Sequence, residues 1–130
     1  MLIIRQQQIE AFRPSLETQF VLRLVDWCAT EFPALASSLG RPDLERRVRR
    51  AYARGRRYGF SSKRDIARFV HFDLKMGADF ESQPGNEWMR PLLAHRELSA
   101  ATRLYRLECR LERLAQIASS QGEDTDAGSH

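Results

Sequence analysis

The stretch Arg56–Phe80, RRYGFSSKRDIARFVHFDLKMGADF, contains the end of one helix and both ends of a second. Gly59 and Gly77 stand where each helix would stop, since glycine readily takes the left-handed conformation of helix C-termini. Ser62 lies three residues before Asp65, which is the spacing of a capping box. Apolar residues then recur on one helical face, at Ile66, Phe69, Val70 and Leu74. The stretch predicts a helix–turn–helix corner. Such a corner can be a structural element at the centre of a fold or a DNA-binding element, here called a DNA reader.

The helix predicted before this corner, over residues 41–58, has two unlike faces. Asp43 and Glu45 lie in its first turn, where the helix dipole favours acids, and its last turns are basic. One half of the helical wheel contains Leu44, Val48, Ala51, Tyr52, Gly55 and Tyr58. The other half contains Arg46, Arg47, Arg49, Arg50, Arg54, Arg56 and Arg57. Because Gly55 costs about 1 kcal/mol of helix propensity relative to Ala, we expect another helix to approach closely there.

Helical patterns also occur on both sides of this pair. The segment RQQQIEAF, from Arg5, is compatible with a helix. A long amphipathic segment ends near Phe32, and its apolar stripe consists of Leu16, Phe20, Leu24, Trp27 and Cys28. Pro33 begins a short helix that Gly40 ends.

The C-terminal half contributes two more predicted helices. Asn86 is the predicted N-cap of a short one, which contains Trp88, Met89, Leu92 and Leu93. Ser99 caps the last one, and its apolar face is expected to close the core. That face consists of Leu104, Leu107, Leu111, Leu114 and Ala118.

These patterns together predict an all-α orthogonal bundle of about five helices around the central helix–turn–helix corner. A single helical domain is expected over residues 1–118. Residues 119–130, SSQGEDTDAGSH, are polar and acidic and are predicted to form a disordered tail.

The composition is that of a soluble globular protein. Of 130 residues, 42% are hydrophobic and 29% are charged, and no apolar run approaches the roughly 18 residues of a membrane span. The N-terminal MLIIR is too short for a signal-peptide core, so we expect a cytoplasmic location and no membrane contact. Cys28 and Cys109 are too few and too distant for a disulfide framework or a zinc site. Cys28 is predicted to be buried and Cys109 to be exposed.

Positive charge is concentrated around the corner. The chain has a net charge of +4, yet the segment from Arg41 to Arg68 contains eleven basic and three acidic residues. Such asymmetry permits contact with nucleic acid, an acidic protein or a membrane surface.

Residues typical of catalysis are scarce. His71, His95 and His130 lack the spacing that would place two of them on one metal ion. The sequence has no phosphate-binding glycine loop, no nucleophile elbow and no Cys-His signature. We therefore expect no enzymatic activity, no catalytic residues, no cofactor and no metal.

The basic residues are compatible with two binding functions and with a purely solvated face. A DNA reader would present residues from the start of the second corner helix, namely Ser61, Ser62, Lys63, Arg64 and Arg68. The arginines of the first corner helix, however, cover nearly half its circumference, which is broader than a stripe that follows a groove. A protein-binding face would use them for bidentate contacts to carboxylates. The candidate partner-binding residues are Arg46, Arg47, Arg50, Arg54 and Arg57.

Several short motifs carry a family resemblance. They are MLIIRQQQ at the N-terminus, a long helix ending in EFP, AYARGRRYGF, DIARFV, MGADF, and Pro-Gly-x-x-Trp before a terminal Leu/Arg helix. From about Met1 to Ala115 the chain resembles small proteins encoded beside bacterial type VI secretion spike and PAAR-repeat genes. The matching positions are mostly turn and core positions, so the resemblance concerns a fold more than a site.

The resemblance implies a non-catalytic accessory factor that helps a chaperone load or stabilise an effector. Its partner would be a protein: an effector chaperone, an effector or a spike component. One alternative is a helix–turn–helix DNA-binding regulator, although nucleic acid is not the expected partner. A second alternative is an immunity-type toxin inhibitor, and the sequence leaves the oligomeric state open.

Overall fold

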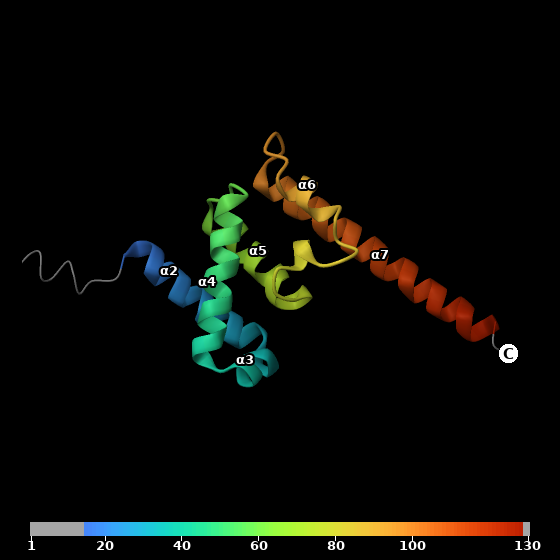
Figure 1. The fold of residues 1–130 in the computed structure, drawn as a ribbon, viewed down its shortest axis with the longest axis horizontal. Coiled ribbons are helices and arrows are strands. Elements are labelled where there is room, and N and C mark those ends of the chain that lie inside the picture. Colours follow the sequence, from blue (N-terminus) through green and yellow to red (C-terminus); the bar gives the residue numbers. More distant parts are fainter. Residues whose placement is uncertain (1–14, 129–130) are drawn as a thin grey trace, which may run out of the picture.

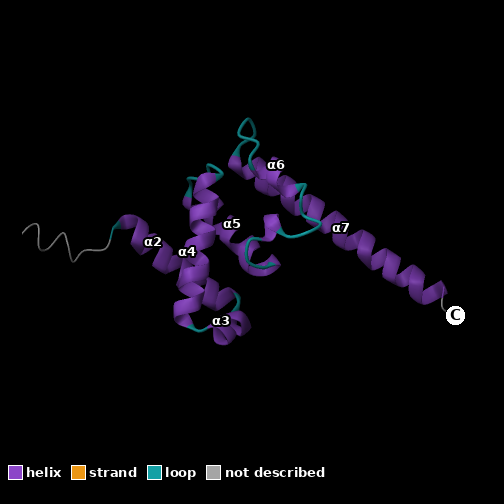
Figure 2. Cartoon of the chain, in the orientation of Figure 1, coloured by secondary structure: helices purple, strands orange, loops and turns teal. Residues whose placement is uncertain are grey.

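The computed structural model describes residues 15–128 of the chain. This part contains six α-helices and one 3₁₀ helix, joined by short loops (Figures 1 and 2). They are α2 (Leu16–Glu31), α3 (Pro33–Leu39), α4 (Arg41–Arg57), α5 (Lys63–Met76), η1 (Phe80–Ser82), α6 (Met89–Leu93) and α7 (Ala100–Gly128). None of the described residues lies in a strand, which confirms the all-α class. The helices number six instead of about five. The helix-compatible segment from Arg5 lies outside the described residues.

The corner between α4 and α5 has the predicted caps. The N–H of Gly59 donates to the carbonyl of Arg56, and the N–H of Phe60 donates to the carbonyl of Gly55, both at 3.0 Å. These two bonds form a Schellman motif, which requires the positive φ of 91° at Gly59. At the start of α5, the Ser62 hydroxyl accepts the N–H of Asp65 at 3.1 Å. Local sequence signals therefore determine both ends of the turn.

Helix α5 is the centre of the core and packs against α2, α4, α7 and η1. The four apolar residues predicted for its inner face are buried, and Phe72 joins them. Helix α4 approaches α5 closely at Gly55, which faces the side chains of Phe69 and Ile66, as expected. The core is thus built around the corner.

The buried face of α2 differs from the predicted stripe. Leu16 and Trp27 are exposed, whereas Val21 and Val25 are buried together with Leu24 and Cys28. The reason is that α2 is covered by α3, α4 and α5, so the stripe that is buried is the one facing these helices. Trp27 instead lies at the edge of the core, with its ring centroid 5.7 Å from that of His71.

Helix α6 begins later than predicted, at Met89. Asn86 is not its N-cap: its side-chain amide donates to the carbonyl of Phe80 at 2.8 Å and so fixes the loop after η1. Trp88 is half-buried, and the guanidinium of Arg110 lies 4.3 Å from the centroid of its ring.

Helix α7 closes the core with its first half only. Leu104 and Leu107 are buried and Leu111 is partly buried, but Leu114 and Ala118 are exposed because the helix runs away from the body (Figure 1). The helix continues to Gly128, beyond Ser119, where the disordered tail was expected to begin. The limits of the folded domain therefore stay a prediction. No helix in the described range has the length and apolar character needed to cross a bilayer.

Candidate functional site: an arginine cleft

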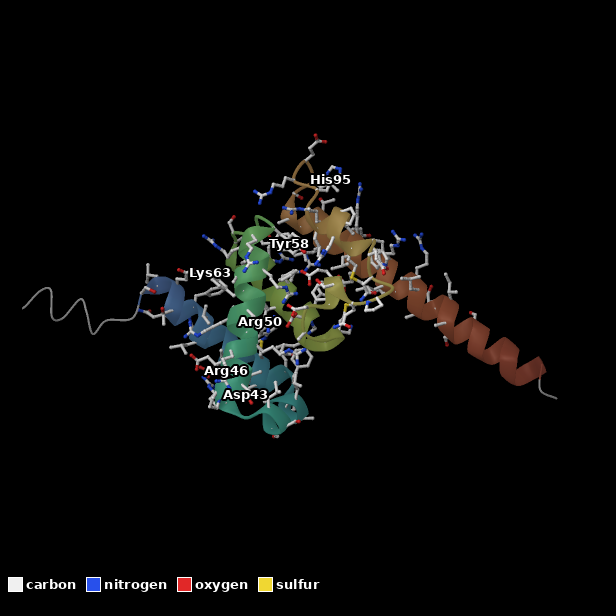
Figure 3. The ribbon with its side chains drawn as sticks, viewed as in Figure 1. Asp43, Arg46, Arg50, Tyr58, Lys63 and His95 are labelled. Carbon is white, nitrogen blue, oxygen red and sulfur yellow. The ribbon has the colours of Figure 1, made fainter. Side chains whose placement is uncertain are left out.

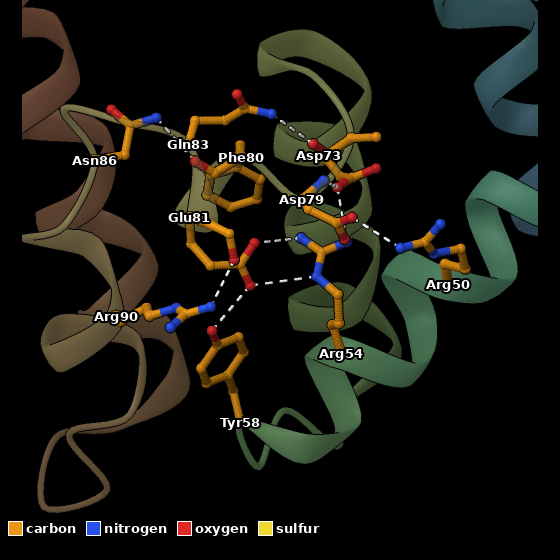
Figure 4. A network of polar contacts seen from close by, with 12 residues as sticks. Arg50, Arg54, Tyr58, Asp73, Asp79, Phe80, Glu81, Gln83, Asn86 and Arg90 are labelled. Atoms are coloured by element: carbon orange, nitrogen blue, oxygen red, sulfur yellow. Dashed lines mark hydrogen bonds and ion pairs between the residues drawn. The ribbon is translucent and has the colours of Figure 1, made fainter.

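Arg54 lies inside the protein and not on a solvated face. Its side chain is 14% exposed. It forms ion pairs with three carboxylates, which lie in α5, in the loop after it and in η1. The distances are 2.8 Å to Asp73, 3.2 Å to Asp79 and 2.6 Å to Glu81. Figure 4 shows the guanidinium between these groups. Arg54 belongs to the arginine half of the helical wheel, but its side chain is mostly buried and paired within the chain.

Asp73 is the buried centre of this network, with a side chain that is 1% exposed. It accepts the backbone N–H of Asp79 at 3.1 Å, in addition to the bond from Arg54. Arg47 donates to its backbone carbonyl at 2.9 Å and lies 3.5 Å from its carboxylate. Arg47, like Arg54, is thus directed at an acidic group of this chain, whereas the sequence pattern grouped both with the candidate partner-binding arginines.

Glu81 and Tyr58 complete the network on its other side. The Tyr58 hydroxyl donates to Glu81 at 2.9 Å. Burial opposes ionisation of Glu81, but hydrogen bonds from Arg54 and Tyr58 more than compensate and lower the pKa of this carboxyl. Burial and the bond to Glu81 raise the pKa of Tyr58 to about 12. Near neutral pH, Glu81 is therefore ionised and Tyr58 is a neutral donor.

Three of the five candidate arginines are exposed along α4. The side chains of Arg46 and Arg50 are 73% and 71% exposed, although they pair with Asp43 and Asp79 respectively. Figure 3 shows Arg46 and Arg50 along the same helix. Arg57, in the last turn, is exposed, and its side chain has no ion-pair partner among residues 15–120, the range whose side chains are described. The five candidates therefore fall into an internal pair and an exposed set.

A cleft of about 760 Å³ opens beside α4, η1 and the segment around α6. Six of its lining residues are arginines, two are acidic, and the rest are small or polar. They are Arg49, Arg50, Ala53, Arg54, Arg57, Tyr58, Asp79, Glu81, Ser82, Arg90, Ala94 and Arg96. The sequence pattern gives no sign of Arg90 or Arg96 as site residues, because neither belongs to a periodic basic face.

Arg103 lies buried behind the cleft, at the start of α7. Its guanidinium donates to the carbonyls of Tyr58 at 2.8 Å and Leu93 at 2.5 Å. It also lies 4.8 Å from the centroid of the Phe60 ring. Its Nε has no hydrogen-bond partner, and no carboxylate of the described chain forms an ion pair with it. Burial and the neighbouring charge of Arg96 lower the pKa of Arg103.

The residues of the predicted DNA reader have mostly structural contacts. Ser62 caps α5, and Arg68 pairs with Glu108 of α7 at 3.2 Å. The ammonium of Lys63 lies 5.8 Å from the centroid of the Phe20 ring. Arg64 is exposed. Ser61, Ser62, Lys63 and Arg64 are consecutive and exposed at the start of α5, whereas Arg68 is half-buried.

The histidines are not brought together either. The ring of His71 lies between those of Trp27 and Phe32, and His95 is exposed in the loop before α7. His130 lies outside the described residues. Among the side chains that the structure describes, those of residues 15–120, no three His, Cys, Asp or Glu are grouped so that they could hold a metal ion.

Comparisons of this chain with protein-family models, with curated proteins and with solved structures find no match.

Proposed function

We propose that this chain is a non-catalytic accessory factor that binds an acidic protein partner through the exposed arginines of α4. The observation that carries the proposal is the exposed set formed by Arg46, Arg50 and Arg57. The first two have only solvent-exposed ion pairs, and such pairs contribute little stability, so their guanidinium groups can exchange partners readily. Arg57 has no ion pair to lose.

The sequence resemblance supports a more specific role for this binding. The motifs shared with proteins encoded beside type VI secretion genes suggest a factor that helps a chaperone load or stabilise an effector. The partner would then be that chaperone, the effector or a spike component. Arginine suits such an interface because its planar guanidinium pairs bidentately with carboxylates and tolerates partial burial.

The position of α5 argues against a DNA reader. A recognition helix contacts base edges with the residues of its N-terminal part, which must therefore be free to bind. In α5 that part has only two exposed basic residues, Lys63 and Arg64, because Arg68 is half-buried and paired with Glu108. Protein binding is therefore the better account of the positive charge.

The test is co-purification with the products of neighbouring genes, followed by sizing of the complex. The triple variant Arg46→Glu, Arg50→Glu and Arg57→Glu should lose its partner and keep its helical circular dichroism spectrum, since none of these side chains is in the core. A matched control, Arg64→Glu, Arg106→Glu and Arg113→Glu, changes the net charge equally at exposed positions elsewhere. This control should retain the partner.

Two results would overturn the proposal. One is equal retention of the partner by both triple variants. The other is enrichment of one sequence motif from a pool of random duplexes at about 150 mM salt, near physiological ionic strength, because selective DNA binding is the property of a regulator.

A further inference from the structure

The acidic residues that line the cleft are already engaged by other residues of the chain. Asp79 pairs with Arg50 at 2.8 Å and with Arg54 at 3.2 Å. Glu81 pairs with Arg54 at 2.6 Å and accepts the Tyr58 hydroxyl. Arg49, a third arginine of the lining, pairs with Glu45 at 2.8 Å. Three of the six arginines are therefore neutralised within the fold.

The other three, Arg57, Arg90 and Arg96, form no ion pair with a carboxylate of residues 15–120, whose side chains the structure describes. Arg90 donates to the hydroxyl of Ser82 at 2.7 Å, and Arg96 donates to the backbone carbonyl of Arg57 at 2.7 Å. Each of these contacts uses one N–H of a guanidinium that has five. Most of the donors of this group of three therefore remain open to a ligand.

Arg103 adds a fourth positive charge from the buried side. It lies close enough to Arg96 to affect its own ionisation, and it too lacks a carboxylate partner. Because a charge in a poorly solvated position is weakly screened, it makes the potential of this end of the cleft more positive. Asp65 partly offsets the charge of Arg103, but no carboxylate among the described side chains forms an ion pair with Arg103, Arg57, Arg90 or Arg96.

We propose that Arg57, Arg90 and Arg96 form the subsite that binds the carboxylates of a short acidic segment of a partner protein. This inference rests on the proposed function and names the chemistry that the partner must present. The volume of about 760 Å³ lies within the usual range of ligand sites and leaves room for several side chains.

The lining favours an acidic polypeptide over a nucleic acid. Single-stranded nucleic acids are held by basic grooves with aromatic rings on which bases stack. Tyr58 is the aromatic residue of this lining, and its hydroxyl is bound to Glu81. Three open guanidinium groups without a stacking surface suit carboxylates, with which arginine forms paired hydrogen bonds.

The test uses a fluorescein-labelled octaglutamate peptide and its octaglutamine counterpart, with the full chain and fluorescence anisotropy as the readout. At about 150 mM salt, octaglutamate should bind and octaglutamine should not. The triple variant Arg57→Gln, Arg90→Gln and Arg96→Gln should lose at least about tenfold in affinity for octaglutamate. The matched control Arg64→Gln, Arg106→Gln and Arg113→Gln has the same net charge and should bind like the parent chain.

A second variant guards against a folding defect, since Arg96 also bonds to the end of α4. The double variant Arg57→Gln and Arg90→Gln leaves that bond in place and should still bind more weakly than the parent. Thermal melts of all variants verify that each is folded at the assay temperature.

Equal binding by the cleft variants and the control variant would overturn the inference, because net charge alone would then account for affinity. Absence of octaglutamate binding to the parent chain would also overturn it. So would a labelled oligothymidylate that binds the parent chain more tightly than octaglutamate does and loses affinity in the cleft variants. The proposed function would survive these failures if the α4 charge reversals still abolished co-purification. Conversely, if octaglutamate binds through the cleft but no partner co-purifies with the chain, the proposed function is contradicted and the subsite is not.

Discussion

A Cβ atom added at Gly55 would lie 3.1 Å from Cδ1 of Phe69, on the facing helix. This distance is shorter than an ordinary contact, so glycine is what allows α4 and α5 to approach each other at the centre of the core. Gly55→Leu should therefore lower the free energy of unfolding by about 1 to 3 kcal/mol, the usual cost of overpacking. Urea denaturation measures the change. Arg106→Leu, at an exposed position of α7, is the control and should change stability little.

The buried carboxylate of Asp73 should be indispensable for stability. Asp73→Asn removes the charge that faces Arg54 and Arg47, and breaking a buried ion pair from one side costs about 3 to 5 kcal/mol. We expect the lower end of this range, because Arg54 retains Glu81. Asp26→Asn disrupts the exposed pair with Arg41 and should cost less than about 1 kcal/mol. Equal losses in urea denaturation would show that burial of the pair is unimportant.

Stability should depend on the ionisation of Glu81. Its folded pKa lies below its unfolded value, so the ionised group stabilises the fold above the unfolded pKa of about 4.3. This contribution is lost as the pH falls through the lower, folded pKa. Glu81→Gln should therefore be less stable than the parent chain at pH 7, and the difference should shrink towards pH 3. A difference in melting temperature that stays constant over this range would contradict the assignment, as would the same trend for the exposed control Glu97→Gln.

The two cysteines should differ in reactivity. Cys28 is fully buried, and burial, followed by the charges of Glu31 and Asp73, raises its pKa to about 12. Cys109 is partly accessible on α7. Because the thiolate is the reactive form, Ellman's reagent should modify one thiol per native chain and two per denatured chain. The variant Cys109→Ser should show no rapid reaction when native; rapid labelling of this variant would mean that Cys28 is accessible.

The end of α7 should contribute nothing to stability. Every side chain from position 112 to position 120 is exposed, so deletion of residues 119–130 should leave the melting temperature unchanged. A longer deletion that begins at Leu111 removes a side chain that packs against the core, and it should lower the melting temperature. A lower melting temperature for the shorter deletion would show that this segment docks on the body.

The corner could be predicted because its signals are local. The glycine at position 59 and the serine cap at position 62 act on backbone groups within a few residues, and a single sequence contains that information. The inner face of α2 could not be predicted in the same way. Its valines and its predicted stripe are comparably apolar, and only the neighbouring helices decide which side is buried.

The candidate site illustrates the same limit for charged residues. A helical wheel places Arg54 with the other arginines, yet its three acidic partners follow it by 19 to 27 positions and lie across the corner. Arg90 and Arg96 belong to a short helix and a loop, where no periodic pattern indicates a shared ligand. Pairing across a turn depends on three-dimensional proximity, which residue spacing alone does not encode.

Arg103 has a consequence for how selective the cleft can be. Its guanidinium donates hydrogen bonds to the carbonyls of Tyr58, at the end of α4, and Leu93, at the end of α6. If α4, with Arg57, and α6, with Arg90, moved apart, the buried guanidinium would lose a hydrogen-bond acceptor. The spacing between these helices is therefore preset before any ligand arrives. A preorganised site loses little conformational entropy on binding, and a fixed spacing accepts carboxylates at one separation in preference to others. In the proposed subsite, this one buried side chain would thus set the separation of carboxylates that the cleft prefers.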